Sequence, residues 1–306
     1  MSVEELNRLF GIPGLAEFEE GNGGLTKLVI AAEGSLAEVY LLGAHVTSWT
    51  PAGGEDVLWL SRESRYEIGK PIRGGIPICH PWFGPLEGDS SAPIHGYVRL
   101  TCLEVESISL TDDGGVSAVL WRRFGKPPGD NWPGDFELRL RVTVGRSLSV
   151  AAETLNRGQR DLVISEALHT YFRVSDVRKV RVTGLAGAAY WSKATGGRAV
   201  QGPEPLTFTA QTDSVYRHSA GEVVLHDPQM LRAISVAKRG SKSTVVWNPW
   251  IEKAAAMPDF GDDEWPEMLC IEAANALDDA VAVPPGKTHV IETIISVEPC
   301  RHGVTV

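Results

Sequence analysis

The stretch FELRLRVTV, residues 136–144, alternates apolar and polar side chains without a break. Apolar residues occupy every even-numbered position, whereas Glu137, Arg139, Arg141 and Thr143 occupy the odd-numbered ones. Successive side chains of a β-strand point to opposite faces, so the pattern predicts a strand with one face in the core and the other in solvent. Such half-buried strands are typical of antiparallel sheets.

The same alternation recurs more weakly in SLSVAAETL (147–155), RKVRVTGL (178–185), LRAISVAK (231–238) and THVIETIISV (288–297). Turn-forming clusters separate the strand-like segments, namely TDDGG (111–115), KPPGDNWPGD (126–135), NRGQRD (156–161), SKATGGRA (192–199) and VPPGKTH (283–289). Many short strands punctuated by 32 Gly and 19 Pro predict an all-β sandwich or barrel.

Helix-forming sequence is scarce. Ser2 and Glu5 have the spacing of a capping box and Gly11 follows, which predicts one short helix over about residues 2–10. The 306 residues contain no polar linker, no composition break and no repeat of fixed period. We therefore expect a single domain over residues 1–306.

Charge and composition exclude several classes of partner. The net charge is −10, from 29 basic and 39 acidic residues, so neither nucleic acid nor an anionic membrane is expected, because both need a basic face. Apolar runs such as VYLLGAHV (39–46) are far shorter than the roughly 20 residues of a membrane helix, and the first residues lack a signal-peptide layout. Four widely spaced cysteines without a C-x-x-C pair indicate free thiols, so we expect a cytoplasmic protein. A monomer is expected as well.

Ionisable residues interrupt apolar sequence in five places. These are Arg73 in PIRGGIPICHPWFGP (71–85), His95 and Arg99 in APIHGYVR (92–99), His169 in EALHTYFRV (166–174), Asp213 in TDSVY (212–216), and Glu272 in EMLCIEAAN (267–275).

Each of these residues also has an ordinary structural explanation. A histidine in a β-sandwich is often a satisfied structural residue, an isolated arginine often forms a surface ion pair, and Asp213 is also suited to capping a turn. Glu272 is harder to dismiss. Burying a carboxylate without a partner costs several kcal/mol or forces its protonation, so we expect Glu272 to be partnered or to line a pocket.

The histidines give no metal motif. His45, His80, His95 and His169 all lie in the first 170 residues, but no two have the i, i+2 or i, i+4 spacing of a local ligand pair. A phosphate loop, a dinucleotide fingerprint and a G-x-S-x-G elbow are also missing. We therefore expect neither a metal nor a nucleotide cofactor.

Six segments, taken in order, closely resemble the aldose 1-epimerase superfamily and, within it, the hexose-6-phosphate mutarotase branch. They are IRGGIPICHPWFGP, HGYVR, LHTYFRV, TDSVY, VVWNPW and CIEAAN. The similarity extends from GAHVTSWTPAGGEDVLWLS (43–61) to the last predicted strand. This resemblance implies a large antiparallel β-supersandwich of the galactose mutarotase type. It also implies interconversion of sugar anomers without redox, metal or organic cofactors, with a small sugar phosphate as the partner.

The resemblance also implies roles for individual residues. His169 matches the family's catalytic acid, and Glu272 matches its catalytic base. His95 and Asp213 match positions that bind the sugar hydroxyls and ring. The remaining substrate-binding residues implied are the two arginines, Arg73 and Arg99, in motifs that recognise the 6-phosphate.

The chemistry requires these residue types. To open a pyranose ring, a base removes the proton of the C1 hydroxyl while an acid protonates the ring oxygen, and the two exchange roles on closure. Ordinary pKa values of about 6.5 and 4.3 allow a protonated His169 and an ionised Glu272 near neutrality, particularly if a carboxylate such as Asp213 lies near the imidazole. A phosphate dianion needs local cations in an acidic protein, and guanidinium groups suit its oxygens, which favours glucose 6-phosphate over free glucose.

Three alternatives remain at this point: an epimerase of free aldoses, a non-catalytic sugar-phosphate-binding protein, and a metal-dependent sugar isomerase. An intact acid–base pair argues against the second, and the absence of ligand spacing argues against the third. We interpret residues 71–85 as one wall of a sugar pocket, with Trp82 and Phe83 offering apolar surface. His80, where relatives often carry an aromatic, is expected to be scaffold or a specificity contact, and the acidic segment 259–268 has no assigned role.

Overall fold

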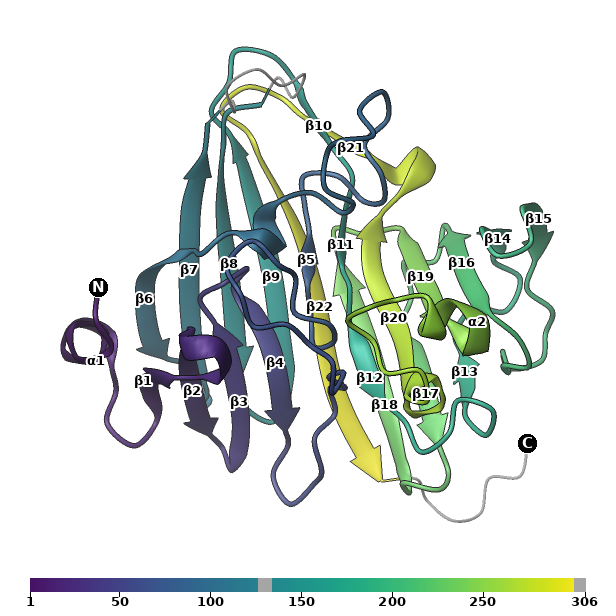
Figure 1. Cartoon of the computed structure of the whole chain (residues 1–306), viewed down its shortest axis with the longest axis horizontal. Helices are drawn as coiled ribbons and strands as arrows, with labels where there is room; N and C mark the ends of the chain where they lie inside the picture. The colour runs from purple at the N-terminus through teal and green to yellow at the C-terminus, as the bar shows by residue number, and fades with distance from the viewer. Residues whose placement is uncertain (126–133, 300–306) are drawn as a thin grey trace.

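The computed structural model describes residues 1–125 and 134–299, and its strands build two large sheets and two smaller ones (Figure 1). Cys300 and most of the predicted turn at 126–135 lie outside the described residues. All strand pairings within the sheets are antiparallel, so the prediction of an all-β antiparallel fold is confirmed.

The first large sheet contains the strands with the clearest alternation. Its order is β13 (Arg181–Thr183), β17 (Val223–Asp227), β18 (Arg232–Arg239), β22 (Thr288–Pro299), β9 (Leu148–Asn156), β8 (Phe136–Val144), β7 (Val116–Phe124) and β6 (Glu104–Leu110). Strand β8 coincides with the FELRLRVTV stretch, and its five apolar side chains are fully buried. Arg141, on the opposite face, is exposed.

The second large sheet carries most of the predicted site residues. Its order is β15 (Gly197–Val200), β14 (Ala189–Ser192), β16 (Thr212–Arg217), β19 (Ser243–Asn248), β20 (Met268–Asn275), β11 (Glu166–Leu168) and β5 (Ile78–Cys79), with β12 (Tyr171–Arg173) also paired to β20. Every residue of β19 and β20 is buried on both faces of the sheet, so any polar side chain there must find a partner or a cavity.

Two smaller sheets complete the fold. One has the order β1 (Ala16–Glu20), β2 (Thr26–Ala32), β3 (Ser35–Tyr40) and β4 (His45–Thr50), and the other pairs β10 (Leu162–Ile164) with β21 (Val281–Val283). The four-stranded sheet and the second large sheet contact different parts of the first large sheet, through β2 and β3 against β7 and β8, and through β20 against β22 (Figure 1). One continuous apolar core joins the three layers.

Two α-helices are found in the described residues. Helix α1 (Val3–Phe10) begins after Ser2, whose hydroxyl accepts the Glu5 backbone N–H while the Glu5 carboxylate accepts the Ser2 N–H. The sequence analysis does not predict helix α2 (Trp250–Ala255), whose N-cap residue is Pro249; the Trp250 N–H donates to the Asn248 side chain at 2.9 Å. It matters for the site because it carries Lys253 to the rim of a cavity.

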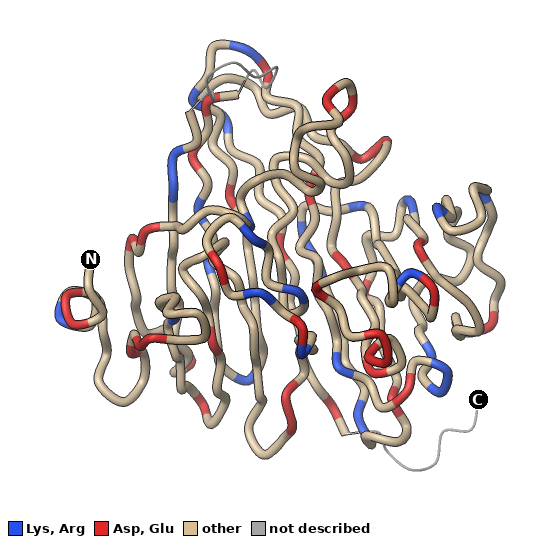
Figure 2. Tube along the Cα trace, viewed as in Figure 1, with Lys and Arg blue, Asp and Glu red and all other residues tan. Residues whose placement is uncertain are grey.

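Charges of both signs are mixed over the surface. Figure 2 shows Lys and Arg interspersed with Asp and Glu along the trace, with no extended basic face in this view of the described residues. No helix among those residues is long and apolar enough to cross a membrane.

Candidate active site

A cavity of about 390 Å³ lies against the second large sheet. It is lined by all six residues singled out from the sequence, which are Arg73, His95, Arg99, His169, Asp213 and Glu272. These residues are separated by as much as 199 positions in the chain, from 73 to 272, so the fold brings distant motifs to one place.

Strand register places the polar side chains on one face of the sheet. Trp247 of β19 pairs with Asp213 of β16, and Val245, two positions earlier, pairs with Glu272 of β20. Residues two apart on a strand share a face, so all four side chains point the same way, into the cavity. His169 lies between β11 and β12, both of which pair with β20 beside Glu272.

His169 and Glu272 form a buried pair. The Nδ1 atom of His169 lies 3.4 Å from Oε1 of Glu272, and the two side chains are 10% and 1% exposed. The His169 ring stacks on Tyr171, with centroids 4.7 Å apart, and meets the ring of Trp247 edge-on. Its main-chain N–H donates to the carbonyl of Pro77. The imidazole is therefore held in a fixed orientation beside the carboxyl group.

Burial moves the pKa values of this pair in opposite directions. It raises the pKa of Glu272 well above the ordinary value, with Lys193 opposing the rise and Asp213 adding to it. It lowers the pKa of His169 well below the ordinary value, and His95, Arg73 and Arg99 act in the same direction. The free site therefore favours a neutral imidazole and a protonated Glu272, which differs from the imidazolium and carboxylate expected from ordinary pKa values.

His95 is fixed as a neutral hydrogen-bond donor. The backbone N–H of Gly84 donates to its Nδ1 at 3.0 Å, so the ring proton must sit on Nε2. Burial lowers the pKa of His95 well below its ordinary value, and the charges of Arg99 and Lys193 lower it further. His95 also adopts a left-handed backbone conformation, with φ of 66°, directly before Gly96.

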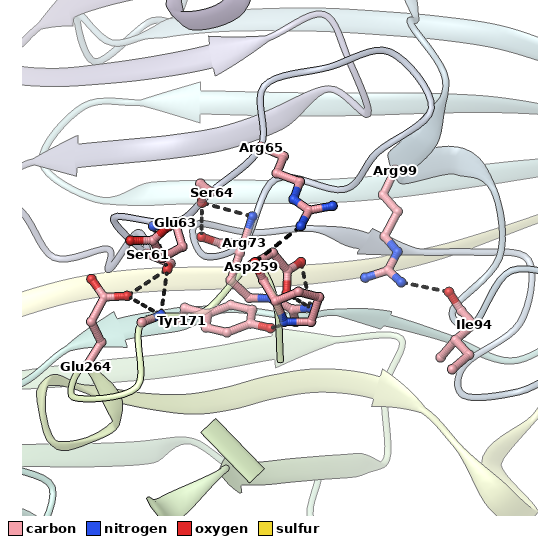
Figure 3. Close-up of polar contacts among 12 residues, drawn as sticks. Ser61, Glu63, Ser64, Arg65, Arg73, Ile94, Arg99, Tyr171, Asp259 and Glu264 are labelled. Atoms are coloured by element: carbon pink, nitrogen blue, oxygen red, sulfur yellow. Dashed lines mark hydrogen bonds and ion pairs between the residues drawn. The ribbon is translucent and has the colours of Figure 1, made fainter. Parts of the chain in front are cut away.

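The two predicted arginines differ in their partners (Figure 3). Nη2 of Arg73 donates to both carboxylate oxygens of Asp259 at 3.0 and 3.1 Å, and its Nη1 donates to the Tyr171 hydroxyl at 3.0 Å. Arg99 donates to the Ile94 carbonyl at 2.7 Å. No ion pair within residues 1–125 and 134–299 includes Arg99, and its Nε is buried without a partner there. Among these residues Arg99 is therefore a partly buried cation without a counter-ion.

Two lysines also reach the cavity and were missed by sequence reasoning. Lys193 lies over the ring of Phe83, with Nζ 4.7 Å from the centroid, and Lys253 lies 3.6 Å from an oxygen of Asp213. Lys193 belongs to the SKATGGRA turn, which carried no signal beyond its turn composition. Tyr171 and Trp247, by contrast, are part of the motifs LHTYFRV and VVWNPW that carried the resemblance.

The segment 71–85 forms part of the cavity wall, through Arg73, Phe83, Gly84 and Pro85. Trp82 does not line the cavity; it is 6% exposed and packs in the core, which corrects the expectation that it offers apolar surface to a sugar. His80 is fully buried, with Nδ1 2.9 Å from a carboxylate oxygen of Glu166. His80 does not line the cavity and is therefore part of the scaffold.

The acidic segment 259–268 packs against the loop that carries Arg73 (Figure 3). Besides the Asp259 contact, the Glu264 carboxylate accepts the Ser61 hydroxyl at 2.6 Å and the Arg62 backbone N–H at 2.9 Å. Glu264 is only 2% exposed, so this contact is internal. The segment therefore holds the arginine loop in place.

Comparison with known proteins agrees with the geometry. The family described as aldose 1-epimerase matches residues 26–296. A protein of Cenchrus ciliaris, named as a candidate glucose-6-phosphate 1-epimerase, is 36% identical over 89% of this chain and 84% of its own length. A protein of Escherichia coli with the same name is 32% identical over 84% of this chain and 86% of its own length.

Solved structures show the same likeness. A candidate mutarotase from Salmonella typhimurium superposes with a TM-score of 0.86 at 28% identity, covering 95% of this chain and 96% of its own. A galactose 1-epimerase from Lactobacillus acidophilus has a TM-score of 0.72 at 12% identity, over 94% and 99% of the two chains, which supports the fold alone. With the family match spanning most of the sequence, the chain belongs to the aldose 1-epimerase family.

Proposed function

We propose that this protein interconverts the α and β anomers of a hexose 6-phosphate, with glucose 6-phosphate as the preferred substrate. The observation that carries the proposal is one cavity that holds both a buried His169–Glu272 pair and Arg99, a cation without a counter-ion among the described residues. The first feature suits proton transfer at a sugar ring, and the second suits an anionic substituent on that sugar.

In this proposal His169 is the catalytic acid and Glu272 the catalytic base. Ring opening begins with a proton on the imidazole, which passes to the ring oxygen while the carboxylate takes the proton of the C1 hydroxyl. The pair then holds a neutral imidazole and a protonated carboxyl group, which is the arrangement that burial favours in the free site. Burial opposes the charged form of both groups, so it disfavours the state from which opening starts and favours the state that opening produces.

Arg99 is the principal phosphate ligand in this proposal, with Lys193 as the second cation. Neither forms an ion pair with an acidic side chain among the described residues, so their charges are available to an incoming dianion. Arg73 is already paired with Asp259 and Tyr171, and we assign it the smaller share of the phosphate interaction. Its main effect is then to hold that wall of the cavity.

Binding of the sugar itself falls to His95 and Asp213. The Nε2–H of His95 is a donor for a sugar oxygen, while the carboxylate of Asp213 accepts hydroxyl protons with Lys253 beside it. Trp247 and Phe83 add apolar surface on which a pyranose ring can rest. A neutral donor and an acceptor orient the ring without adding positive charge next to the acid–base pair.

The test is anomer exchange measured by NMR. The exchange rates of α- and β-glucose 6-phosphate, and of α- and β-glucose, are compared with and without the protein. We expect acceleration of both, with a higher kcat/KM for the phosphate ester. No acceleration of either exchange would refute the proposed function, and preference for free glucose would replace it with an aldose epimerase.

The acid–base assignment is tested by Glu272→Gln and His169→Asn, which keep the side chains polar while removing their capacity to exchange protons near neutrality. Their controls are Glu153→Gln on β9 and His226→Asn on β17, both in the other large sheet and away from the cavity. We expect the site variants to lose about 10² to 10⁴-fold in kcat and the controls to keep the full rate. Full activity in both site variants would overturn the assignment.

A further inference from the structure

Three side chains able to bind a metal meet beside the cavity, and two of them, His169 and Glu272, line it. Nitrogen, sulfur and oxygen atoms of His169, Cys270 and Glu272 all lie within 4.8 Å of one another, and all three residues are buried. Cys270 and Glu272 are two positions apart on β20 and therefore share a face of the strand. His169 comes from the connection between β11 and β12, which both pair with β20.

Several ligand atoms of this cluster have no hydrogen-bond partner among the described residues. Nδ1 of His169 and both carboxylate oxygens of Glu272 are enclosed and have no hydrogen-bond partner within the described part of the chain. Buried polar atoms are normally satisfied, so three unsatisfied atoms at one point call for an explanation. The nitrogen and one of the oxygens face each other, with Nδ1 3.4 Å from Oε1.

The spacing agrees with tetrahedral zinc. Bonds of about 2.1 Å to nitrogen and oxygen place two ligands of a tetrahedron about 3.4 Å apart, which equals the observed separation of Nδ1 and Oε1. A sulfur bonded at about 2.3 Å would sit about 3.6 Å from the nitrogen. The three donor atoms lie within 4.8 Å of one another, so the Cys270 sulfur needs to move by only about 1 Å to reach the distance expected for a tetrahedral zinc ligand.

We propose that zinc enters through the substrate cavity, binds His169, Cys270 and Glu272, and thereby inhibits the enzyme. The expected loss of turnover rests on the proposed function. The metal forms bonds to the imidazole nitrogen, the thiolate and the carboxylate. The Cys270 thiol, and the carboxyl group where it is protonated, release their protons to solvent without any change of oxidation state. Zinc would then occupy both groups that the proposed reaction uses. Magnesium and calcium prefer sets of oxygen ligands only, so neither should compete.

Metal binding can be tested without measuring activity. Cobalt(II) is added to the protein, and absorption is recorded for a thiolate-to-cobalt charge-transfer band in the near ultraviolet. We expect the band in the unaltered protein and in Cys102→Ser, the matched control at a partly exposed thiol. It should be lost in Cys270→Ser and abolished by added zinc. A missing band in the unaltered protein, or a band unchanged in Cys270→Ser, would overturn the site.

Inhibition is tested in the anomer-exchange assay. We expect zinc to inhibit competitively with the sugar phosphate, and EDTA to restore the rate. Cys270→Ser should bind zinc at least about 100-fold more weakly, since even the loss of an outer partner costs 10- to 100-fold. Equal inhibition of Cys270→Ser and the unaltered protein would contradict the proposal.

If Cys270→Ser does not fold, X-ray absorption of the zinc complex of Cys102→Ser decides the question. We expect one sulfur neighbour at about 2.3 Å beside nitrogen and oxygen ligands. A zinc shell without sulfur would refute the site. Because the cobalt and X-ray absorption measurements do not use turnover, their failure is distinguishable from failure of the proposed anomer interconversion.

Discussion

Replacing Arg99 by methionine should separate phosphate recognition from sugar recognition. Methionine keeps most of the apolar length of the side chain and removes only the charge and its donors. Within the described residues, the Arg99 guanidinium donates to the Ile94 carbonyl and has no carboxylate partner. The free protein therefore loses little when the guanidinium is removed, whereas a bound phosphate loses a charged ligand.

The magnitude follows from the hydrogen bond that the phosphate no longer receives. A hydrogen bond to a charged group contributes about 1.5–3 kcal/mol, which corresponds to a decrease of about 10- to 150-fold in kcat/KM for glucose 6-phosphate. For free glucose we expect a change of less than about 2-fold, because that substrate has no phosphate for Arg99 to bind. Selectivity between the two substrates should fall by the same factor.

Arg73→Met is the control variant for Arg99→Met, because it should affect stability more than substrate selectivity. Removing Arg73 strips Asp259, whose side chain is only 13% exposed, of its counter-ion, and it removes a donor from the Tyr171 hydroxyl. Leaving such groups unpaired costs about 1–3 kcal/mol of folding free energy. We therefore expect Arg73→Met to lower the urea midpoint, and Arg99→Met to leave it unchanged or raise it.

NMR exchange rates for both substrates and urea unfolding followed by tryptophan fluorescence provide the two measurements. Equal slowing of glucose and glucose 6-phosphate exchange by Arg99→Met would refute the phosphate role of Arg99, because the residue would then act on the sugar or on the fold. Loss of selectivity in Arg73→Met alone, at unchanged stability, would also refute that role, since it would make Arg73 the principal phosphate ligand.

Three further predictions concern the acid–base pair, acid stability and the loop at His95. The double variant Glu272→Gln/His169→Asn should have nearly the same kcat as either single variant in the exchange assay, because the rate losses of residues that act together are not additive. If the rate losses of the two single variants multiply in the double variant, the two residues have independent roles. Burial lowers the pKa of His45 to about 4 and that of His95 and His169 well below the ordinary value. The unfolded chain takes up protons on these residues near pH 6.5, at a higher pH than the folded protein does, so the free energy of unfolding should fall on acidification below that pH. The lowered pKa of His226 acts in the same direction, whereas Glu272 opposes it, since its raised pKa lets the folded state keep a proton that the unfolded state releases above about pH 4.5. Each whole proton of net difference changes the free energy of unfolding by about 1.4 kcal/mol per pH unit. Urea titrations between pH 7 and 5 measure this slope, and a flat profile would contradict the assigned shifts. Finally, a Cβ at Gly96 (φ +69°) would lie 2.0 Å from the His80 carbonyl oxygen, whereas at Gly88 (φ +81°) it meets nothing within 4 Å. Gly96→Ala should therefore destabilise the protein, in urea unfolding, by clearly more than the roughly 1 kcal/mol expected for Gly88→Ala, and equal losses would refute the clash.

The sequence predicted some strands better than others for a physical reason. In β8, β9, β18 and β22 one face is in the core and the other is wet, so side-chain polarity alternates and the strands are visible. Strands β19 and β20 are buried on both faces, so their sequences lack that period. They entered the prediction only through the motifs VVWNPW and CIEAAN.

Contacts between residues far apart in the chain limit how much of the site can be predicted from the sequence. The six predicted residues do line one cavity, yet no local pattern indicates that Arg73 meets Asp259, which is 186 positions away in the chain. Nor does the sequence indicate that burial lowers the pKa of His169 and raises that of Glu272. The effect depends on how completely the sheet and its loops exclude solvent, which is a property of the assembled fold.

The stretch from α2 to β20 contacts the sugar-binding, arginine and acid–base residues of the proposed site. Its Lys253 contacts Asp213, its Asp259 holds Arg73, and its Glu272 lies against His169. Between them, Glu264 fastens the same stretch to Ser61 in the loop before Arg73. One continuous segment thus joins the wall that carries Arg73 to the strand that bears Glu272. Its acidic residues Asp259 and Glu264 fix the position of the Arg73 loop relative to that strand.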